Sequence, residues 1–284
     1  MTKLRRSLLF VPGNKPDLGV KATKLPTDVV VVDLEDGVSP DDKNRARLQA
    51  EKMLEELDFG NREVALRVNR INTLNGLSDI LALVGWRRKP DIIIIPKVES
   101  AGEVQIYYDL LKEMNAPCQL FPVVESTRGL QAIQAIMNAS ARITTLSFGI
   151  ADLSAELNCR IAWEPFLFFR SAVVAAGALA GAQVIDPPFL NIKDETGLVE
   201  ECKKARDMGF SGKICIHPSQ LEPVNKVFTP TSGEVERAQK VVKAAETCGG
   251  GPIAVDGRMV DVAVVKAAKR VLAIVDHLGT KKDS

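Results

Sequence analysis

Histidine is almost missing from this chain, because His217 and His277 are the only two in 284 residues. A metal or catalytic site built from several imidazoles is therefore excluded. Any metal ion must be held mainly by oxygen atoms, and oxygen ligands favour Mg²⁺ or Mn²⁺.

Paired cysteines, a strong charge and long apolar runs are also missing. Five cysteines stand alone without a CxxC pair, which argues for a reducing compartment and against disulfides or a zinc site. The formal net charge is +1, so neither a nucleic acid nor an anionic membrane is an expected partner. No segment approaches the roughly 20 apolar residues of a membrane span, and the early run "SLLFV" is too short for a signal peptide. The expected location is the cytoplasm.

Apolar, β-branched runs recur along the chain, with segments of helical spacing between them. Continuous runs such as "VVVV" and "IIII" predict strands that are buried on both faces, as in a parallel sheet. The predicted strands are residues 7–13, 28–36, 63–69, 91–99, 120–125, 144–152, 182–189 and 213–220.

Eight strand–helix units predict an α/β fold of the TIM (β/α)₈ barrel type over residues 1–230, since such barrels are typically about 250 residues long. An open doubly wound sheet is the alternative, but eight evenly spaced strands rarely occur in one open sheet. Residues 231–284 are expected to form a C-terminal helical extension of two helices joined by the loop "TCGGGPIAVDGRM".

Polar residues gather where each predicted strand meets its following loop. In a barrel these strand ends meet at one mouth, which is the usual active-site face. A single polar strand end often only bonds loop backbone, but several charged groups at one opening indicate a ligand. These residues are Asn14, Lys15, Glu35, Asp36, Arg67, Asn69, Lys97, Glu99, Glu125, Asp152, Asp186 and His217.

Glu125 and Asp152 are the strongest metal candidates, because they follow adjacent predicted strands and two carboxylates plus water suit Mg²⁺. The alternative is that they form salt bridges to Arg67 or Arg128. Glu35 or Asp36 would hold metal-bound water, or else both would simply brace Lys97.

Arg67 and Lys97 raise two further possibilities. An arginine between the apolar neighbours of "ALRVN" needs a substrate carboxylate, a developing oxyanion, or pairing with Glu99 or Glu35. Lys97 occupies a place where a Schiff-base aldolase would put its nucleophile. Acidic neighbours would keep that lysine protonated, which favours an ion pair instead.

An ordered set of motifs spans nearly the whole chain, from Arg6 to about Leu272. It resembles the citrate lyase β-subunit-like branch of the HpcH/HpaI aldolase family. The motifs are "RSLLFVPGNKPD", "VVVDLEDGVSPDDKNRAR", "LRVNRINTLNG", "IIPKVES", "VVESTRGL", "LSFGIADLSAELN", "GKICIHPSQLEPVNKVFTPT" and "DGRMVDVAVVKAAKRVL".

The resemblance implies a Mg²⁺-dependent barrel that breaks or forms a carbon–carbon bond in a 3-hydroxyacyl thioester, usually of coenzyme A. Glu125 and Asp152 match the family's metal carboxylates, and Arg67 matches its substrate-binding arginine. Contacts with coenzyme A are implied for Lys21, Ile216 and His217.

Asp261 matches an aspartate that, in the family, reaches the active site of a neighbouring subunit, and there Asp261 is expected to protonate the enolate carbon. The implied assembly is a homotrimer or a hexamer of two trimers. Taken alone, Asp261 has the position of a helix N-cap.

The chain also differs from its relatives. It has no histidine after an early strand, where the pyruvate-enolate aldolases of the wider family have their base, and this favours a thioester lyase. Leu190 and Asn191 replace an aromatic residue and an aspartate in the loop "DPPFLNIKDETGL".

The expected reaction is cleavage of citramalyl-CoA to acetyl-CoA and pyruvate, with Glu35 or Asp36 as the base through a water molecule. The alternatives are malyl-CoA lyase, a citrate lyase β subunit acting on citryl carried by an acyl-carrier protein, and a non-catalytic coenzyme A-binding barrel.

Overall fold

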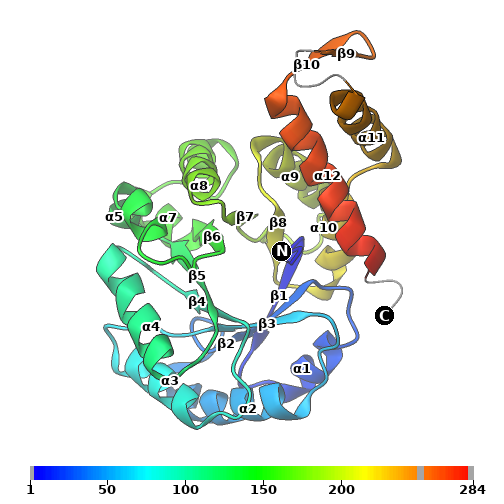
Figure 1. The fold of residues 1–284 in the computed structure, drawn as a ribbon. Helices are drawn as coiled ribbons and strands as arrows, with labels where there is room; N and C mark the ends of the chain where they lie inside the picture. The colour runs from blue at the N-terminus through cyan, green and yellow to red at the C-terminus, as the bar shows by residue number, and fades with distance from the viewer. Residues whose placement is uncertain (1–2, 248–252, 281–284) are drawn as a thin grey trace. The chain divides into compact units, whose positions relative to one another are not determined.

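The computed structural model describes residues 3–247 and 253–280. Eight parallel strands pair in sequence order, and β1 closes onto β8 through the register Ser7↔Lys213 (Figure 1). The predicted barrel is therefore confirmed. Its strands are β1 (Ser7–Pro12), β2 (Val29–Asp33), β3 (Glu63–Arg67), β4 (Ile92–Ile95), β5 (Gln119–Val124), β6 (Thr145–Phe148), β7 (Gln183–Asp186) and β8 (Gly212–Cys215).

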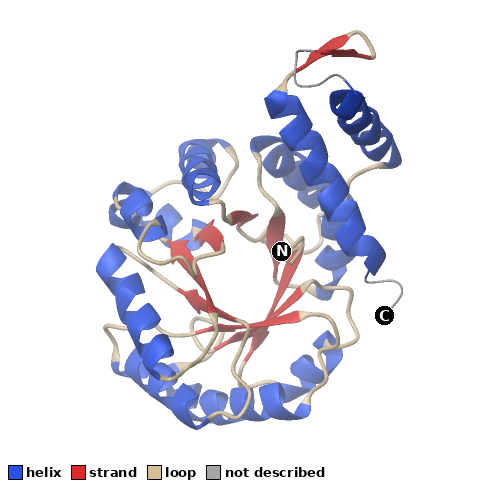
Figure 2. Ribbon diagram, viewed as in Figure 1, coloured by secondary structure: helices blue, strands red, loops and turns tan. Residues whose placement is uncertain are grey.

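Helices follow the strands and lie around the outside of the barrel (Figure 2). The α-helices are α1 (Pro16–Ala22), α2 (Lys43–Glu56), α3 (Leu74–Gly85), α4 (Ala101–Glu113), α5 (Thr127–Gln131), α6 (Ile133–Met137), α7 (Ile150–Leu157), α8 (Leu167–Ala180), α9 (Glu195–Met208) and α10 (Leu221–Phe228). Short 3₁₀ turns are η1 (Pro40–Asp42), η2 (Glu164–Phe166) and η3 (Pro218–Gln220).

Several helices begin at a polar cap that the sequence places directly after a strand loop. The side chains of Thr73, Ser100, Ser126 and Asp194 each accept a hydrogen bond from the backbone N–H three residues later. Such caps satisfy N–H groups that have no partner within the helix. They define where the loops at the mouth of the barrel end.

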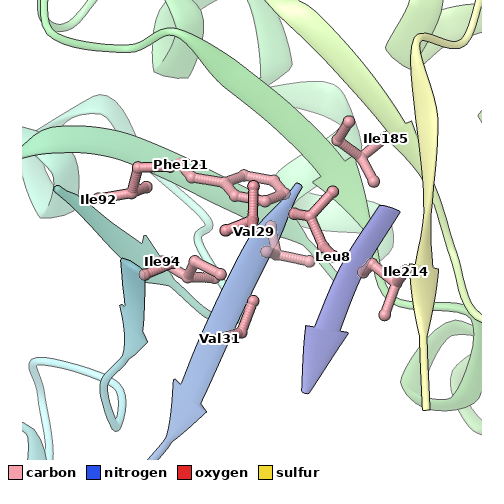
Figure 3. Close-up of a cluster of buried hydrophobic side chains, with 10 residues drawn as sticks. Leu8, Val29, Val31, Ile92, Ile94, Phe121, Ile185 and Ile214 are labelled. Carbon is pink, nitrogen blue, oxygen red and sulfur yellow. The ribbon is translucent and has the colours of Figure 1, made fainter. Parts of the chain in front are cut away.

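An apolar cluster fills the middle of the barrel (Figure 3). Its residues are Leu8, Val29, Val31, Ala65, Ile92, Ile94, Phe121, Val123, Ile185 and Ile214. Successive side chains of a strand point to opposite faces, so residues two apart share a face. Three charged residues each lie two positions after a core residue of a strand. Their side chains therefore point inward at the carboxyl ends of the strands. The pairs are Val31 and Asp33, Ala65 and Arg67, and Val123 and Glu125.

Two expectations about local structure are wrong. Asp152 does not end a strand, because β6 stops at Phe148 and Asp152 lies in the first turn of α7. In the expected C-terminal loop, β9 (Ile253–Val255) and β10 (Arg258–Val260) form an antiparallel pair. Asp256 and Gly257 between them have φ of 48° and 72°. An Asp–Gly pair with both φ positive is the signature of a tight hairpin turn.

The chain divides into two compact units, one of residues Arg5–Asn225 and the other of Lys226–Ser284 with Met1–Leu4. The second unit contains α11 (Ser232–Thr247), the β9–β10 hairpin and α12 (Val262–Thr280). It has its own apolar cluster, which includes Ala238, Val241, Val260 and Ala268. Among the described helices, none is long and apolar enough to cross a membrane.

Candidate active site

Arg67 is held by carboxylates at the mouth of the barrel. Its Nε and Nη2 each donate a hydrogen bond of 2.7 Å to Asp33, and its Nη1 lies 2.8 Å from Glu35 Oε2. Burial alone would lower the pKa of Arg67, but its hydrogen bonds to Asp33 and the charges of Asp33, Glu35 and Glu125 together outweigh burial and raise that pKa. Of the two ion pairs considered as alternatives for Arg67, the one with Glu35 is present beside the pair with Asp33, whereas Glu99 binds Arg70.

Asp33 was missed as a site residue from the sequence, although a signal for it was present. It lies two residues beyond Val31 on the same strand face, and the barrel register pairs Asp33 directly with Arg67. A carboxylate and a guanidinium on the same layer of adjacent strands are expected to meet.

Glu125 and Asp152 line the same cavity, and their carboxyl groups interact closely enough for Asp152 to raise the pKa of Glu125. Glu125 is only 7% exposed, and its carboxyl pKa is raised well above the usual value by burial first, and then by Asp152 and Glu35. Gly149 makes room for it, because a Cβ at that position would lie 2.7 Å from Glu125 Cγ. A cation bound between the two carboxyl groups would relieve their repulsion.

This pair fits a hard divalent cation. No group of three or more His, Cys, Asp or Glu side chains is arranged for metal binding within residues 3–247 and 253–280. The protein therefore offers two carboxylates, and Mg²⁺ commonly keeps its remaining positions for water and substrate oxygens.

Lys97 lies between the acidic pair Glu35–Asp36 and Asp152 of the pair Glu125–Asp152. It has a left-handed backbone, with φ of 53°, which is uncommon for a residue other than glycine and is often found at functional sites. Its Nζ donates to Glu35 Oε1 at 2.7 Å and to Asp36 Oδ1 at 3.2 Å, and it lies 3.9 Å from Asp152 Oδ2. Burial lowers the pKa of Lys97, but Glu35 and Asp36 more than offset this and raise it. A protonated amine cannot start Schiff-base chemistry, so the geometry favours the ion pair.

A cavity of about 350 Å³, which we call the acidic cavity, opens beside these groups. Its acidic and basic lining residues are Asp33, Asp36, Arg67, Glu125 and Asp152. The rest of its wall is apolar or glycine, formed by Phe10, Pro12, Gly37, Val123, Phe148, Gly149, Ile150, Ala151, Pro188, Leu190, Ile214 and Ile216. Asp36 therefore faces the cavity, whereas Glu35 is 5% exposed and contacts Arg67 and Lys97.

The residues expected to contact coenzyme A lie in different places. Lys21, in the last turn of α1, lines a separate hollow of about 510 Å³ together with Asn14, Lys15 and Arg45. Ile216 lines the acidic cavity, and the ring of His217 accepts the Ser219 N–H at the start of η3. The structure therefore separates Lys21 from Ile216 rather than placing both in one cavity.

Asp261 begins α12. Its Oδ1 accepts a hydrogen bond of 3.0 Å from the backbone N–H of Val264. The helix-cap interpretation is thereby confirmed. Its action at a neighbouring subunit's site stays a prediction.

Comparison with known proteins agrees with this geometry. Residues 6–218 match the HpcH/HpaI aldolase/citrate lyase family. The chain belongs to this family. The expectation drawn from the ordered motifs is thus confirmed, and the chain is an enzyme of the aldolase/citrate lyase type.

Three relatives match along nearly their whole length. The (3S)-malyl-CoA thioesterase of Cereibacter sphaeroides is 37% identical, covering 94% of this chain and 93% of the relative. Citrate lyase subunit beta of Leuconostoc mesenteroides is 34% identical, with coverages of 97% and 95%. The mitochondrial citramalyl-CoA lyase of Rattus norvegicus is 30% identical, with coverages of 98% and 88%.

A solved structure shows the same fold. CitE from Mycobacterium tuberculosis, crystallised with magnesium, acetoacetate and coenzyme A, superposes with a TM-score of 0.80 at 30% identity. The match covers 95% of this chain and 98% of that chain. The similarity therefore includes the barrel and most of the C-terminal unit.

Proposed function

We propose that this protein is a Mg²⁺-dependent carbon–carbon lyase that cleaves a 3-hydroxy-3-carboxyacyl-CoA thioester. The observation that supports it most is the Glu125–Asp152 pair, in which a buried carboxyl group and a second carboxyl group lie on the wall of one cavity beside Arg67. Such a pair is poorly placed for a structural role, because each carboxylate raises the free energy of ionising the other.

Glu125 and Asp152 would hold the metal ion, and Mn²⁺ would suit the same oxygen ligands. When bound there, Mg²⁺ supplies Lewis-acid stabilisation to the hydroxyl and adjacent carboxylate oxygens of the substrate. The crystallised relative with magnesium and coenzyme A supports this choice of cofactor and substrate.

The protein's own side chains would move the protons. Asp36 accepts the substrate's hydroxyl proton through a water molecule, because it faces the cavity whereas Glu35 is committed to Arg67 and Lys97. As the hydroxyl becomes a carbonyl, the carbon–carbon bond breaks and its electron pair passes to the thioester, which becomes an enolate. Arg67 offsets the charge on the thioester oxygen. Asp261 of a neighbouring subunit then protonates the enolate carbon.

The charges around the cavity favour a substrate with one carboxylate. Four carboxylates line it but Arg67 is its one basic group among the described residues, and Asp33 and Glu35 already neutralise that arginine. A second substrate carboxylate, as in a citryl group, would lack a cation and cost free energy to bury. The apolar wall suits a methyl group, so citramalyl-CoA, giving acetyl-CoA and pyruvate, is the preferred substrate.

The hollow beside α1 suits the anionic part of coenzyme A. Lys15, Lys21 and Arg45 line it, and these cations match phosphate groups. Ile216 lies on the wall of the acidic cavity, where it would contact the acyl chain near the thioester, with His217 next to it in the chain.

One panel assay tests the proposal. The purified protein is given malyl-CoA, citramalyl-CoA and citryl-CoA, with Mg²⁺ or with EDTA, and acetyl-CoA, free CoA and 2-oxo acids are measured. We expect Mg²⁺-dependent release of pyruvate and acetyl-CoA from citramalyl-CoA. Activity that survives EDTA would contradict the metal assignment.

Thioester hydrolysis is the second candidate, because the 37% identical relative is a malyl-CoA thioesterase. It would release free CoA without any 2-oxo acid. Cleavage of citryl only when it is carried by an acyl-carrier protein would indicate a citrate lyase β subunit, and release of glyoxylate a malyl-CoA lyase. No turnover of any thioester would favour a coenzyme A-binding barrel.

A further inference from the structure

A buried lysine lies beneath the loop that presents the acidic pair Glu35–Asp36. Lys43, the first residue of α2, is 8% exposed, and its Nζ donates hydrogen bonds of 2.7 Å to the backbone oxygens of Leu34 and Glu35. Neither acceptor is a carboxylate. Lys43 is also absent from the described residues that line the acidic cavity.

This placement is costly for the fold. A buried ammonium loses its hydration, and burial accordingly lowers the pKa of Lys43 despite the nearby charges of Asp33 and Asp79. The positive end of the α2 dipole adds to the cost, because cations are disfavoured at helix N-termini. An apolar residue would fill the space without either penalty, so the two carbonyl bonds are the feature that needs the lysine.

The same loop is held from its other side by Asp33. That carboxylate accepts the backbone N–H groups of Glu35 and Gly37, each at 2.9 Å, and also binds Arg67. Lys43 binds the carbonyls while Asp33 binds the amides, so consecutive peptide groups of residues 34–37 are fixed in orientation. Asn69 adds a further bond to the loop, from Nδ2 to Leu34 O at 2.8 Å.

The orientation of these peptides decides where the two side chains go. With the carbonyls of Leu34 and Glu35 directed to Lys43, the Glu35 carboxylate meets Arg67 and Lys97, and Asp36 lines the cavity. Rotation of either peptide would move both carboxylates together. A misplacement of about 1 Å by a change away from the reacting atoms is enough to cost about 100-fold in rate.

We propose that Lys43 is a positioning residue, whose ammonium fixes the peptides of residues 34–35 and thereby sets the place of Asp36 and Glu35 at the active site. The kinetic consequence rests on the lyase function proposed above. Glu125 follows β5 and Asp152 lies in the first turn of α7, so Lys43 holds neither metal carboxylate directly.

Three variants test this. Lys43→Met removes both donors at similar length, Lys43→Arg keeps a charged donor, and Lys52→Met is a matched control at an exposed lysine of the same helix. Amide hydrogen exchange of Glu35 and Gly37 reports on the loop without any substrate, and thermal unfolding establishes that each variant is folded.

In Lys43→Met we expect exchange of these two amides to become at least about 10-fold faster. We expect kcat on the cleaved thioester to fall about 100-fold, with KM and Mn²⁺ affinity within about threefold of wild type. Lys43→Arg should recover most of the loss, and Lys52→Met should match wild type.

Unchanged exchange in folded Lys43→Met overturns the proposal, whatever the turnover. Faster exchange with unchanged kcat shows that Lys43 only stabilises the loop, and also overturns it. If wild type cleaves no thioester, the lyase function fails, while the exchange rates still decide whether Lys43 holds the loop.

Discussion

At the scale of single residues, a missing side chain explains how a glutamate occupies the tip of a buried strand. Glu125 continues the inward face of β5 and ends against Gly149, which begins the turn into α7. An alanine there would bring its Cβ within 2.7–2.8 Å of Glu125 Cγ, Cδ and Oε2. Real Cβ atoms do not approach other atoms so closely, so the carboxylate would have to move.

We therefore predict that Gly149→Ala weakens Mn²⁺ or Mg²⁺ binding by about 10- to 100-fold, the range typical when support of a metal ligand is lost. Isothermal titration calorimetry measures this directly. Gly85→Ala is the control, because a Cβ at Gly85 meets nothing within 4 Å. Equal metal affinity in Gly149→Ala and wild type would show that Glu125 is not a metal ligand.

At the scale of elements, a side-chain link joins the loops that follow three neighbouring strands. Glu99, after β4, accepts hydrogen bonds from Arg70 Nη2 at 2.7 Å and from Ser126 Oγ at 3.0 Å. The bond from Arg70 holds the pKa of the Glu99 carboxyl below its usual 4.5, and Ser126 adds to this. A depressed folded-state pKa contributes stability above pH 4.5 that is lost as the pH falls through the folded value.

Glu99→Gln should therefore lower the free energy of unfolding by about 1 kcal/mol at pH 7, since the link is charged but partly exposed to solvent. The difference from wild type should shrink as the pH falls below 4.5 and vanish below the folded-state pKa, where wild-type Glu99 is protonated as well. Urea denaturation at pH 7, 4.5 and 3 measures this, with the exposed Glu113→Gln on α4 as control. A pH-independent difference would mean that the charge of Glu99 contributes nothing.

The sequence was most informative where the two-residue period of a strand applies. That period places Arg67 and Glu125 inward at the mouth of the barrel, and applied to Val31 it also places Asp33 inward there. It failed for Asp152, because Gly149 ends the strand and the next residues turn into a helix. The bonds of Lys43 depend on how α2 packs behind the β2 loop, which is a tertiary contact that no local pattern encodes.

At the scale of the whole molecule, the chain consists of a barrel and a C-terminal unit, each with its own apolar cluster. Asp261 belongs to the second unit and caps α12. Asparagine caps helices about as well as aspartate does, so Asp261→Asn should change the free energy of unfolding by no more than about 0.5 kcal/mol. That substitution therefore isolates the acidity of Asp261 from its structural role.

If Asp261 acts at the active site of a neighbouring subunit, mixing two inactive variants should restore activity. Asp261→Asn keeps the barrel carboxylates but loses the acid, and Glu125→Gln keeps the acid but loses a metal ligand. In assemblies mixed at equal ratio, a barrel from the first variant meets an Asp261 from the second at about one quarter of the sites, because each partner is drawn with a chance of about one half. Turnover of the mixed protein should approach about one quarter of the wild-type value. The turnover of each variant alone should be at least about 100-fold below wild type. Should Asp261 act within its own chain, no site in the mixture would hold both groups, and mixing would restore nothing.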